Sequence, residues 1–298
     1  MMRTDDSAIG RRIALVRATG RSALAATLLA GTALLWPALG LAETPAKDPA
    51  KTQTASAEAP DSAWTEYLKS DLFGDRQLQA GTDVVSLDAP NRAADPAVVP
   101  MTISLDPTKD IRKVTLVIDE NPSPVAATFK IAEGSGLTEL STRVRVNAYT
   151  DVHVVAEDAS GNLFVTKRFV KAAGGCAAPA AKDPDVAARE MGKMKLRSFG
   201  AVEGESDKRE AQLQIRHPNN SGLQKDQVTL LYIPAHFIDE IDVSRDGKTL
   251  FTMTGGISIS EDPSFRFNYS GETEKPFEVR ATDTDGNVFE ETFETAPA

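Results

Sequence analysis

Short segments in which apolar and polar residues alternate recur along this chain, and no other feature constrains its fold as strongly. Alternation gives a β-strand one apolar face to bury and one polar face. Turn-rich stretches separate the segments, which is typical of antiparallel strands joined by short connections. In the first half the segments are 84–87, 98–105, 113–118, 127–131, 140–146, 153–156 and 163–170.

The same pattern resumes after residue 192 and continues almost to the end of the chain. Seven or eight short strands in about a hundred residues are typical of an immunoglobulin-like sandwich. The sequence therefore predicts an all-β protein with two immunoglobulin-like antiparallel β-sandwich domains. The segments of the second half are 195–199, 210–215, 230–233, 238–243, 249–253, 264–269, 276–281 and 288–293.

The last predicted hairpins of the two halves have similar sequences. Residues 158–164 read Asp-Ala-Ser-Gly-Asn-Leu-Phe, and residues 283–289 read Asp-Thr-Asp-Gly-Asn-Val-Phe. Asp, Gly and Asn suit tight turns because they tolerate positive φ. A shared hairpin at the same place in both halves indicates two related domains, at 61–170 and 193–298. A flexible Gly/Ala linker at 171–192 is predicted to join them.

The first 42 residues have the pattern of an export signal. Five arginines form a basic start, an uncharged stretch follows from Ser22, and small residues end it at Ala42, where cleavage is predicted. An uncleaved membrane anchor is the alternative, since the uncharged stretch is long enough to span a bilayer. We expect a periplasmic protein, and the pair Arg11-Arg12 leaves the choice between the general and the twin-arginine export route open.

Two further segments precede the first strands. Residues 43–60 are rich in Pro, Ala, Thr and Lys without an apolar period, and they predict a disordered linker. A short helix is predicted next, capped by Asp61 or Ser62. Its spacing gives one apolar face, which we expect to pack against the first domain. That face consists of Trp64, Tyr67, Leu68, Leu72 and Phe73.

The charge of the chain excludes some partners. Without residues 1–42, which carry five Arg and two Asp, 28 basic and 41 acidic residues remain, for a net charge of −13. Nucleic-acid binding requires clustered Lys and Arg, so it is not expected. No later apolar run is long enough to cross a bilayer, and no membrane association is expected after signal cleavage.

Known enzyme motifs are missing from the sequence. There is no phosphate-binding glycine loop, no nucleophile elbow and no dinucleotide fingerprint. His153, His217 and His236 do not stand at metal-ligand spacings, and structural roles are expected for each. The sequence therefore predicts no cofactor, no metal site and no catalytic residues; an autonomous metal or hydrolytic enzyme remains the least favoured alternative.

Cys176 is the single cysteine of the chain, and it lies among small residues, in Gly174-Gly175-Cys176-Ala177-Ala178. One cysteine cannot form an internal disulfide, so in an oxidising compartment it stays free, pairs between molecules or carries a modification. Glycine gives the backbone freedom, so Gly174 and Gly175 are predicted to make this arm flexible. We expect a thiol with little packed around it that reacts like a free peptide thiol.

These motifs, in this order, resemble a known pair of proteins. Residues 61–181 are similar to SoxY, the thiol subunit of the sulfur-oxidation carrier, which ends in Gly-Gly-Cys-Gly-Gly and shares the Val99-Pro100 strand and the Asp158 hairpin. Residues 193–296 are similar to SoxZ, its partner. That similarity rests on His217-Pro218, on Asp262-Pro263-Ser264-Phe265-Arg266-Phe267 and on Asp285-Gly286-Asn287. The fused arrangement resembles the SoxYZ-like carriers associated with quinoprotein dehydrogenases.

The resemblance implies a carrier and no enzyme activity. Cys176 would bind a sulfur-containing intermediate covalently and present it to periplasmic enzymes of the sulfur-oxidation or quinoprotein dehydrogenase type. The two domains would pack together as the separate subunits do. The chain departs from SoxY in two respects: its arm is tethered at both ends, and Ala177-Ala178-Pro179 replaces the two glycines after the cysteine. The alternative is an accessory interaction module for a quinoprotein dehydrogenase, with Cys176 incidental or in an intermolecular disulfide.

Overall fold

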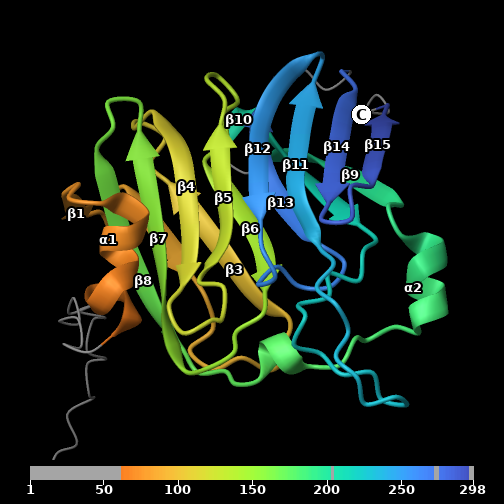
Figure 1. Ribbon diagram of the computed structural model, residues 1–298. Coiled ribbons are helices and arrows are strands. Elements are labelled where there is room, and N and C mark those ends of the chain that lie inside the picture. The colour runs from red at the N-terminus through yellow and green to blue at the C-terminus, as the bar shows by residue number, and fades with distance from the viewer. Residues whose placement is uncertain (1–61, 203–204, 272–274, 295–298) are drawn as a thin grey trace, which may run out of the picture. The chain divides into compact units, whose positions relative to one another are not determined.

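The computed structural model describes residues 62–298 apart from 203–204, 272–274 and 295–298 (Figure 1). The predictions of a signal peptide at 1–42 and a disordered tract at 43–60 lie outside these residues. In the part described, no helix has the length and apolar character needed to cross a membrane. The strands form two sheets, and the prediction of an all-β sandwich is confirmed.

The strands arise where the sequence alternates. Val99–Leu105, for example, has every second residue buried, because its apolar residues all face the core. The first half forms β1 (Leu78–Ala80), β2 (Val85–Asp88), β3 (Val99–Leu105), β4 (Ile111–Ile118), β5 (Val125–Ile131), β6 (Glu139–Val144), β7 (Thr150–Asp158) and β8 (Leu163–Val170). The second half forms β9 (Met194–Val202), β10 (Glu205–Ile215), β11 (Ile238–Arg245), β12 (Lys248–Gly255), β13 (Ser264–Ser270), β14 (Phe277–Asp283) and β15 (Val288–Phe293).

Both sheets contain strands from both halves of the chain. The nine-stranded sheet has the order β1-β8-β7-β4-β5-β12-β11-β14-β15, and the six-stranded sheet has the order β2-β3-β6-β13-β10-β9. Figure 1 shows the larger sheet in front, running from the first half on the left to the second half on the right. The halves therefore share two continuous sheets, and each sheet contains one junction between halves.

The junction in the larger sheet joins β5 to β12. These strands pair antiparallel from Phe251 opposite Ile131 to Gly255 opposite Ala127. In the smaller sheet β6 pairs with β13, with Phe267 opposite Leu140. An unpaired sheet edge invites association, and each half covers an edge of the other. The pairing of the two halves within one chain is thus shown by backbone register.

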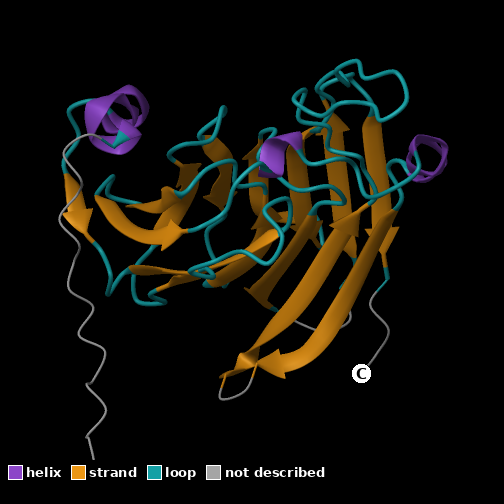
Figure 2. Ribbon diagram, turned by 90° about the horizontal axis from the view of Figure 1, so that it is seen from below, coloured by secondary structure: helices purple, strands orange, loops and turns teal. Residues whose placement is uncertain are grey.

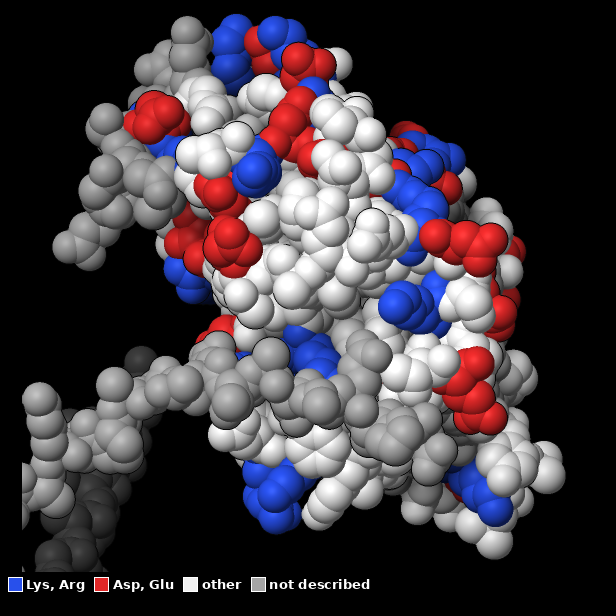
Figure 3. Space-filling model, turned by 90° about the vertical axis from the view of Figure 1, so that its left-hand side faces the viewer, with Lys and Arg blue, Asp and Glu red and all other residues white. Residues whose placement is uncertain are grey.

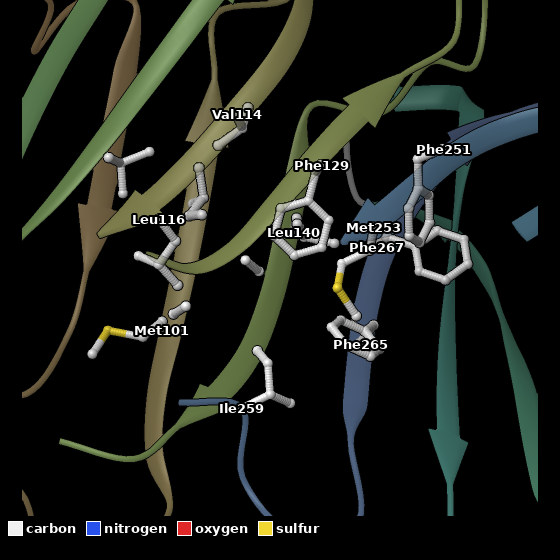
Figure 4. Close-up of a cluster of buried hydrophobic side chains, with 14 of the residues drawn as sticks. Met101, Val114, Leu116, Phe129, Leu140, Phe251, Met253, Ile259, Phe265 and Phe267 are labelled. Atoms are coloured by element: carbon white, nitrogen blue, oxygen red, sulfur yellow. The ribbon is translucent and has the colours of Figure 1, made fainter. Parts of the chain in front are cut away.

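One apolar core runs through both halves between the sheets (Figure 4). Leu116 and Phe129 from the first half and Phe251 and Phe265 from the second belong to it, and all four are fully buried. Phe129 meets Phe251 with ring centroids 6.3 Å apart and Phe265 at 6.2 Å. A fully buried side chain of this size stabilises a fold by about 1.5–3 kcal/mol. The junction is therefore held by core packing as well as by hydrogen bonds.

A second, smaller cluster lies on the outer face of the larger sheet. The helical segment η1 (Trp64–Leu68) and α1 (Lys69–Phe73) supplies its helical side, which confirms the predicted short helix. Trp64 stacks on His153 with ring centroids 3.9 Å apart and an interplanar angle of 8°. His153 Nδ1 lies 2.9 Å from Asp119 Oδ1, and burial raises the pKa of that carboxyl group. His153 thus has a packing role.

Charged side chains of both signs are interspersed over the side of the molecule near α1 and β8 (Figure 3). Glu157 there pairs with Arg76, at 2.7 Å, and with Lys113. Lys167 Nζ lies 2.9 Å from Asp151 Oδ2. Solvent-accessible pairs of this kind contribute about 0–1 kcal/mol each, so they add little to stability.

At three places the structure differs from what the sequence predicts. The segment 230–233 is not a strand; it lies in the loop between β10 and β11, and its apolar side chains are exposed. β1, three residues long and parallel to β8, was not predicted, because so short a strand has no detectable period. The linker contains a helix, α2 (Pro184–Glu190), in which Asp183 caps the N-terminus by accepting from the amides of Asp185 and Val186.

Candidate functional site

The cysteine arm lies against the first half along its backbone. Gly174 N donates to Asn147 O at 2.8 Å, and Gly175 N donates to Val146 O at 3.1 Å. The arm forms a short 3-10 turn, η2 (Gly175–Ala177), at one end of the sandwich, where Figure 2 shows it among the surrounding loops. The arm is therefore ordered by the residues that follow β6.

The two glycines before the cysteine have different roles. A Cβ atom on Gly175 would lie 2.0 Å from Pro96 O and 2.6 Å from Val146 O, closer than any real contact. Gly175 is thus required for close backbone approach. Gly174 has a φ of +79°, and a Cβ atom added there would have no atom within 4 Å. Glycine is therefore favoured at this position by the left-handed backbone conformation and not by lack of space. The predicted role of Gly175 as a source of flexibility is replaced by one in packing.

A loop of the second half holds the other side of the arm. Ser221 Oγ donates a hydrogen bond to Cys176 O. Gln224 Nε2 donates to Ala178 O at 2.9 Å. Cys176 is therefore enclosed between residues of the SoxY-like and SoxZ-like halves. Ser221 and Gln224 hold the arm through its backbone oxygens, and neither forms a hydrogen bond to the thiol.

The thiol of Cys176 is buried, with 0 % of the residue exposed. The expectation of an arm with little packed around it is wrong, because small residues here let the arm pack closely against its neighbours. Burial raises the pKa of Cys176, and the nearby Arg145 lowers it in part. Among the described residues Sγ has no hydrogen-bond partner. In this conformation the sulfur is shielded, and burial favours its protonated form.

Arg145 places a positive charge beside the arm. Its side chain is 1 % exposed, and it donates from Nη1 to Gly175 O at 3.4 Å and from Nη2 to Asn219 O at 3.3 Å. Both bonds are long, and Nε has no partner among the described residues. Burial lowers the pKa of Arg145, while Cys176 opposes this shift. No carboxylate forms an ion pair with it in the part described. A buried cation without a direct ion pair is costly, and the charges of Glu261 and Asp95 offset that cost only in part.

The structure brings His217 and His236 together beside one carboxylate. His236 Nε2 lies 2.8 Å from Asp283 Oδ2, and His217 Nε2 lies 3.4 Å from the same oxygen. The imidazole rings meet edge to face with centroids 4.7 Å apart. The sequence does not reveal this cluster, because His217 and Asp283 are 66 positions apart along the chain.

Asp283 is the first residue of the last hairpin turn. Burial alone would raise the pKa of Asp283, but hydrogen bonds from Asn287 and His236 outweigh it and lower that pKa to about 2. Burial also lowers the pKa of His217, and the neighbouring His236 adds to this shift. Burial therefore favours the neutral form of His217, beside the carboxylate of Asp283. The cluster joins the cysteine arm through Asn219, whose carbonyl oxygen accepts from Arg145.

Comparisons with known proteins agree with this architecture. Residues 69–176 match the family model of the sulfur oxidation protein SoxY, and residues 199–294 match that of the sulphur oxidation protein SoxZ. The SoxY match ends at Cys176. A comparison with curated proteins finds no match.

Among solved structures, the sulfur carrier protein SoxY from Chlorobium limicola f thiosulfatophilum is 26% identical, with a TM-score of 0.31; the alignment covers 35% of this chain and 86% of that one. A superoxide reductase (neelaredoxin) from Ignicoccus hospitalis is 11% identical with a TM-score of 0.27, covering 30% of this chain and 78% of that one. Likenesses this distant carry no argument about the site.

The fold and the arm define a class: a β-sandwich protein with a single thiol enclosed between its two halves. The two family-model matches, one to each half of the chain, show which family this class is. The chain belongs to the sulfur-oxidation carrier proteins, as a SoxY domain and a SoxZ domain fused in one polypeptide.

Proposed function

We propose that the chain is a periplasmic carrier that holds a sulfur-containing intermediate covalently on Cys176 and presents it to partner redox enzymes. The observation that supports this most is the position of Cys176. It is the last residue of the SoxY match, it follows two glycines whose amides bond the first half, and its own carbonyl oxygen accepts from Ser221 of the second half. Enzymes of the sulfur-oxidation or quinoprotein dehydrogenase type are the partners in this proposal.

Attachment forms a sulfur–sulfur bond. The Cys176 thiol loses its proton, and the thiolate sulfur joins the sulfur of the incoming group while two electrons leave for the partner redox enzyme. In release, an acceptor nucleophile attacks the carried sulfur, the sulfur–sulfur bond breaks, and its electron pair leaves with the Cys176 thiolate. The thiol is fully buried, so the arm must open before either step. Opening breaks the two side-chain bonds from Ser221 and Gln224, which contribute about 0.5–1.5 kcal/mol each.

Arg145 suits a carried group that is anionic. Its guanidinium bonds the carbonyl oxygen of Gly175, directly before the cysteine, and lacks an ion-pair partner in the described chain. A guanidinium offers several N–H donors in a plane, which matches oxyanions attached through sulfur. When the loaded arm closes, the negative charge of the group would compensate the buried cation. This favours anionic sulfur groups over neutral ones as cargo.

The chain has no catalytic role in this proposal. A solved SoxY is a sulfur carrier protein, and in the proposal the redox step belongs to the partner. The proposal needs only that the arm can close on the cargo and open toward an enzyme.

A second candidate function is supported by other observations. The loop between β10 and β11 exposes Val228 at 90 %, with Leu230, Leu231 and Tyr232 also exposed. Exposed apolar groups of this kind occur at protein-binding surfaces. Together with the burial of Cys176, they favour an accessory docking module for a quinoprotein dehydrogenase, in which the cysteine is incidental or forms an intermolecular disulfide.

Replacement of the thiol separates the two functions. Cys176→Ser, introduced into the chromosome of the source organism, should abolish the sulfur-dependent oxidation that the chain supports, because oxygen cannot form the sulfur–sulfur bond. A buried hydroxyl costs about 1–3 kcal/mol when unbonded, so thermal unfolding should confirm that the variant stays folded. Ala177→Ser, in the same turn and exposed, is the matched control and should retain activity. Full activity of the Cys176→Ser strain would favour the docking module.

A further inference from the structure

Three potential ligands from three separate segments converge in the SoxZ-like half. His217 follows β10, His236 precedes β11, and Asp283 ends β14. Their ligand atoms, two imidazole nitrogens and one carboxylate oxygen, lie within 4.8 Å of one another. Atoms that share a zinc ion at about 2.0–2.2 Å from it are separated by roughly 3–4 Å, so only small shifts would be needed.

The ring of His217 is oriented by its neighbours. Nδ1 lies 2.8 Å from Asn219 Oδ1, so a proton on Nδ1 can be donated to that oxygen. In this tautomer Nε2 has a free lone pair and faces Asp283. Ligating histidines commonly donate their other ring N–H in this way, which fixes the ring. The other tautomer, with Nδ1 accepting from Asn219 N at 3.1 Å and Nε2 donating to Asp283, is available without metal.

The carboxylate of Asp283 has one oxygen, Oδ2, with a lone pair directed at the imidazoles. Oδ1 accepts from the amides of Asp285 and Asn287, at 3.0 and 2.9 Å. Oδ2 accepts from Asn287 Nδ2 at 2.8 Å and faces both imidazoles with its remaining lone pair. A metal ion there would take the place of any imidazole N–H that points at Oδ2, and each ligating neutral imidazole would carry its proton on the other ring nitrogen, Nδ1.

The equivalent hairpin of the first half shows that the turn does not need the histidines. Asp158 Oδ1 accepts from the amides of Ser160 and Asn162, and Oδ2 accepts from Asn162 Nδ2 at 2.8 Å. These are the same turn bonds as those of Asp283. In that hairpin none of the described histidines lies beside the carboxylate. The pair of imidazoles in the second half is therefore an addition to the turn.

We propose that His217, His236 and Asp283 bind one divalent transition-metal ion, with zinc the best match. Imidazole and carboxylate ligands suit zinc, and three protein ligands leave a fourth position for water or another ligand. His217 and Asp283 are enclosed, while the His236 side chain is 17 % exposed and gives an entry path. Asp285 Oδ2, 3.5 Å from His236 Nε2, stands at that entrance and can supply the fourth ligand.

Isothermal titration of the full mature chain, stripped by chelator, with zinc chloride tests this proposal. We expect one ion per chain. His236→Gln preserves a side-chain N–H donor toward Asp283 but cannot ligate through an imidazole. Loss of an outer partner weakens metal sites by about 10–100-fold, and loss of a ligand should cost at least as much. The expected result is therefore at least a tenfold weaker affinity in the variant, with unchanged thermal unfolding in chelator.

The Cys176→Ser variant separates this site from the carrier function. It removes the one thiol that could bind zinc on its own, and it should still bind one ion with the affinity of the natural chain. The proposal is wrong if the natural chain binds no zinc at one-to-one stoichiometry. It is equally overturned if His236→Gln binds as tightly, or if binding disappears with the thiol. None of these outcomes depends on whether Cys176 carries sulfur.

Discussion

Alkylation of Cys176 in the folded protein should be about 100-fold slower or more at neutral pH than in the same chain unfolded in urea. The thiol is fully buried, so the reagent must wait for the arm to open. Each factor of ten corresponds to about 1.4 kcal/mol of opening free energy. Mass spectrometry after timed exposure to iodoacetamide measures both rates. Equal rates, after correction for the effect of urea on the reagent, would show that the arm is open in solution.

The pH dependence of stability has a definite sign for this group. Burial raises the pKa of Cys176, with Arg145 opposing in part, so the folded chain holds the thiol proton to higher pH than the unfolded chain does. The resulting stabilisation is complete below the ordinary thiol pKa, about 8.5, and is lost as pH rises through the higher folded value. Cys176→Ser should remove this alkaline loss. Urea titrations of both proteins across that range measure it.

Substitution of Gly175 should open the arm. In Gly175→Ala the new Cβ would lie 2.0 Å from Pro96 O, so the backbone must move away and lose its bond to Val146 O. Overpacking of this kind costs about 1–3 kcal/mol, and more where backbone atoms collide. Because the arm lies outside the main core, most of this cost should appear as local opening. We expect alkylation of Cys176 to accelerate more than tenfold.

Gly174→Ala is the matched control for that substitution. Its φ of +79° makes alanine unfavourable by about 1–2 kcal/mol, but a built Cβ has no atom within 4 Å. The variant should therefore accelerate alkylation less than Gly175→Ala does. If the two variants react at the same rate, the close approach at Gly175 does not hold the arm.

Local pattern was sufficient to predict the strands that bury one face. β3 and β13, whose apolar residues alternate, were predicted to within a residue or two of their ends. The segment 230–233 has an apolar run without alternation and lies in a loop, because its side chains have no core to face. Alternation of apolar residues indicates a strand with one buried face. An apolar run without alternation does not distinguish an exposed loop from a buried strand.

The site could be predicted only in part, for a different reason. Cys176 was identified from its small neighbours and its single occurrence, yet those neighbours also allow close packing, so composition alone does not decide between an open and a closed arm. Arg145 was not identified, because its burial depends on Gly175 and Asn219, which are distant in sequence. His217 and His236 meet only after β11 and β14 pair. Long-range contacts of this kind leave no local signal.

The intact mass of the protein, purified without reductant from its own cells during sulfur oxidation, tests the carrier proposal most directly. We expect a fraction of molecules to exceed the mass of the mature chain by a sulfur-containing group. Fragmentation should assign that group to the peptide 172–182, and a thiol reductant should remove it. A chain that carries only a free thiol, or only a disulfide to another molecule, under these conditions would contradict the account.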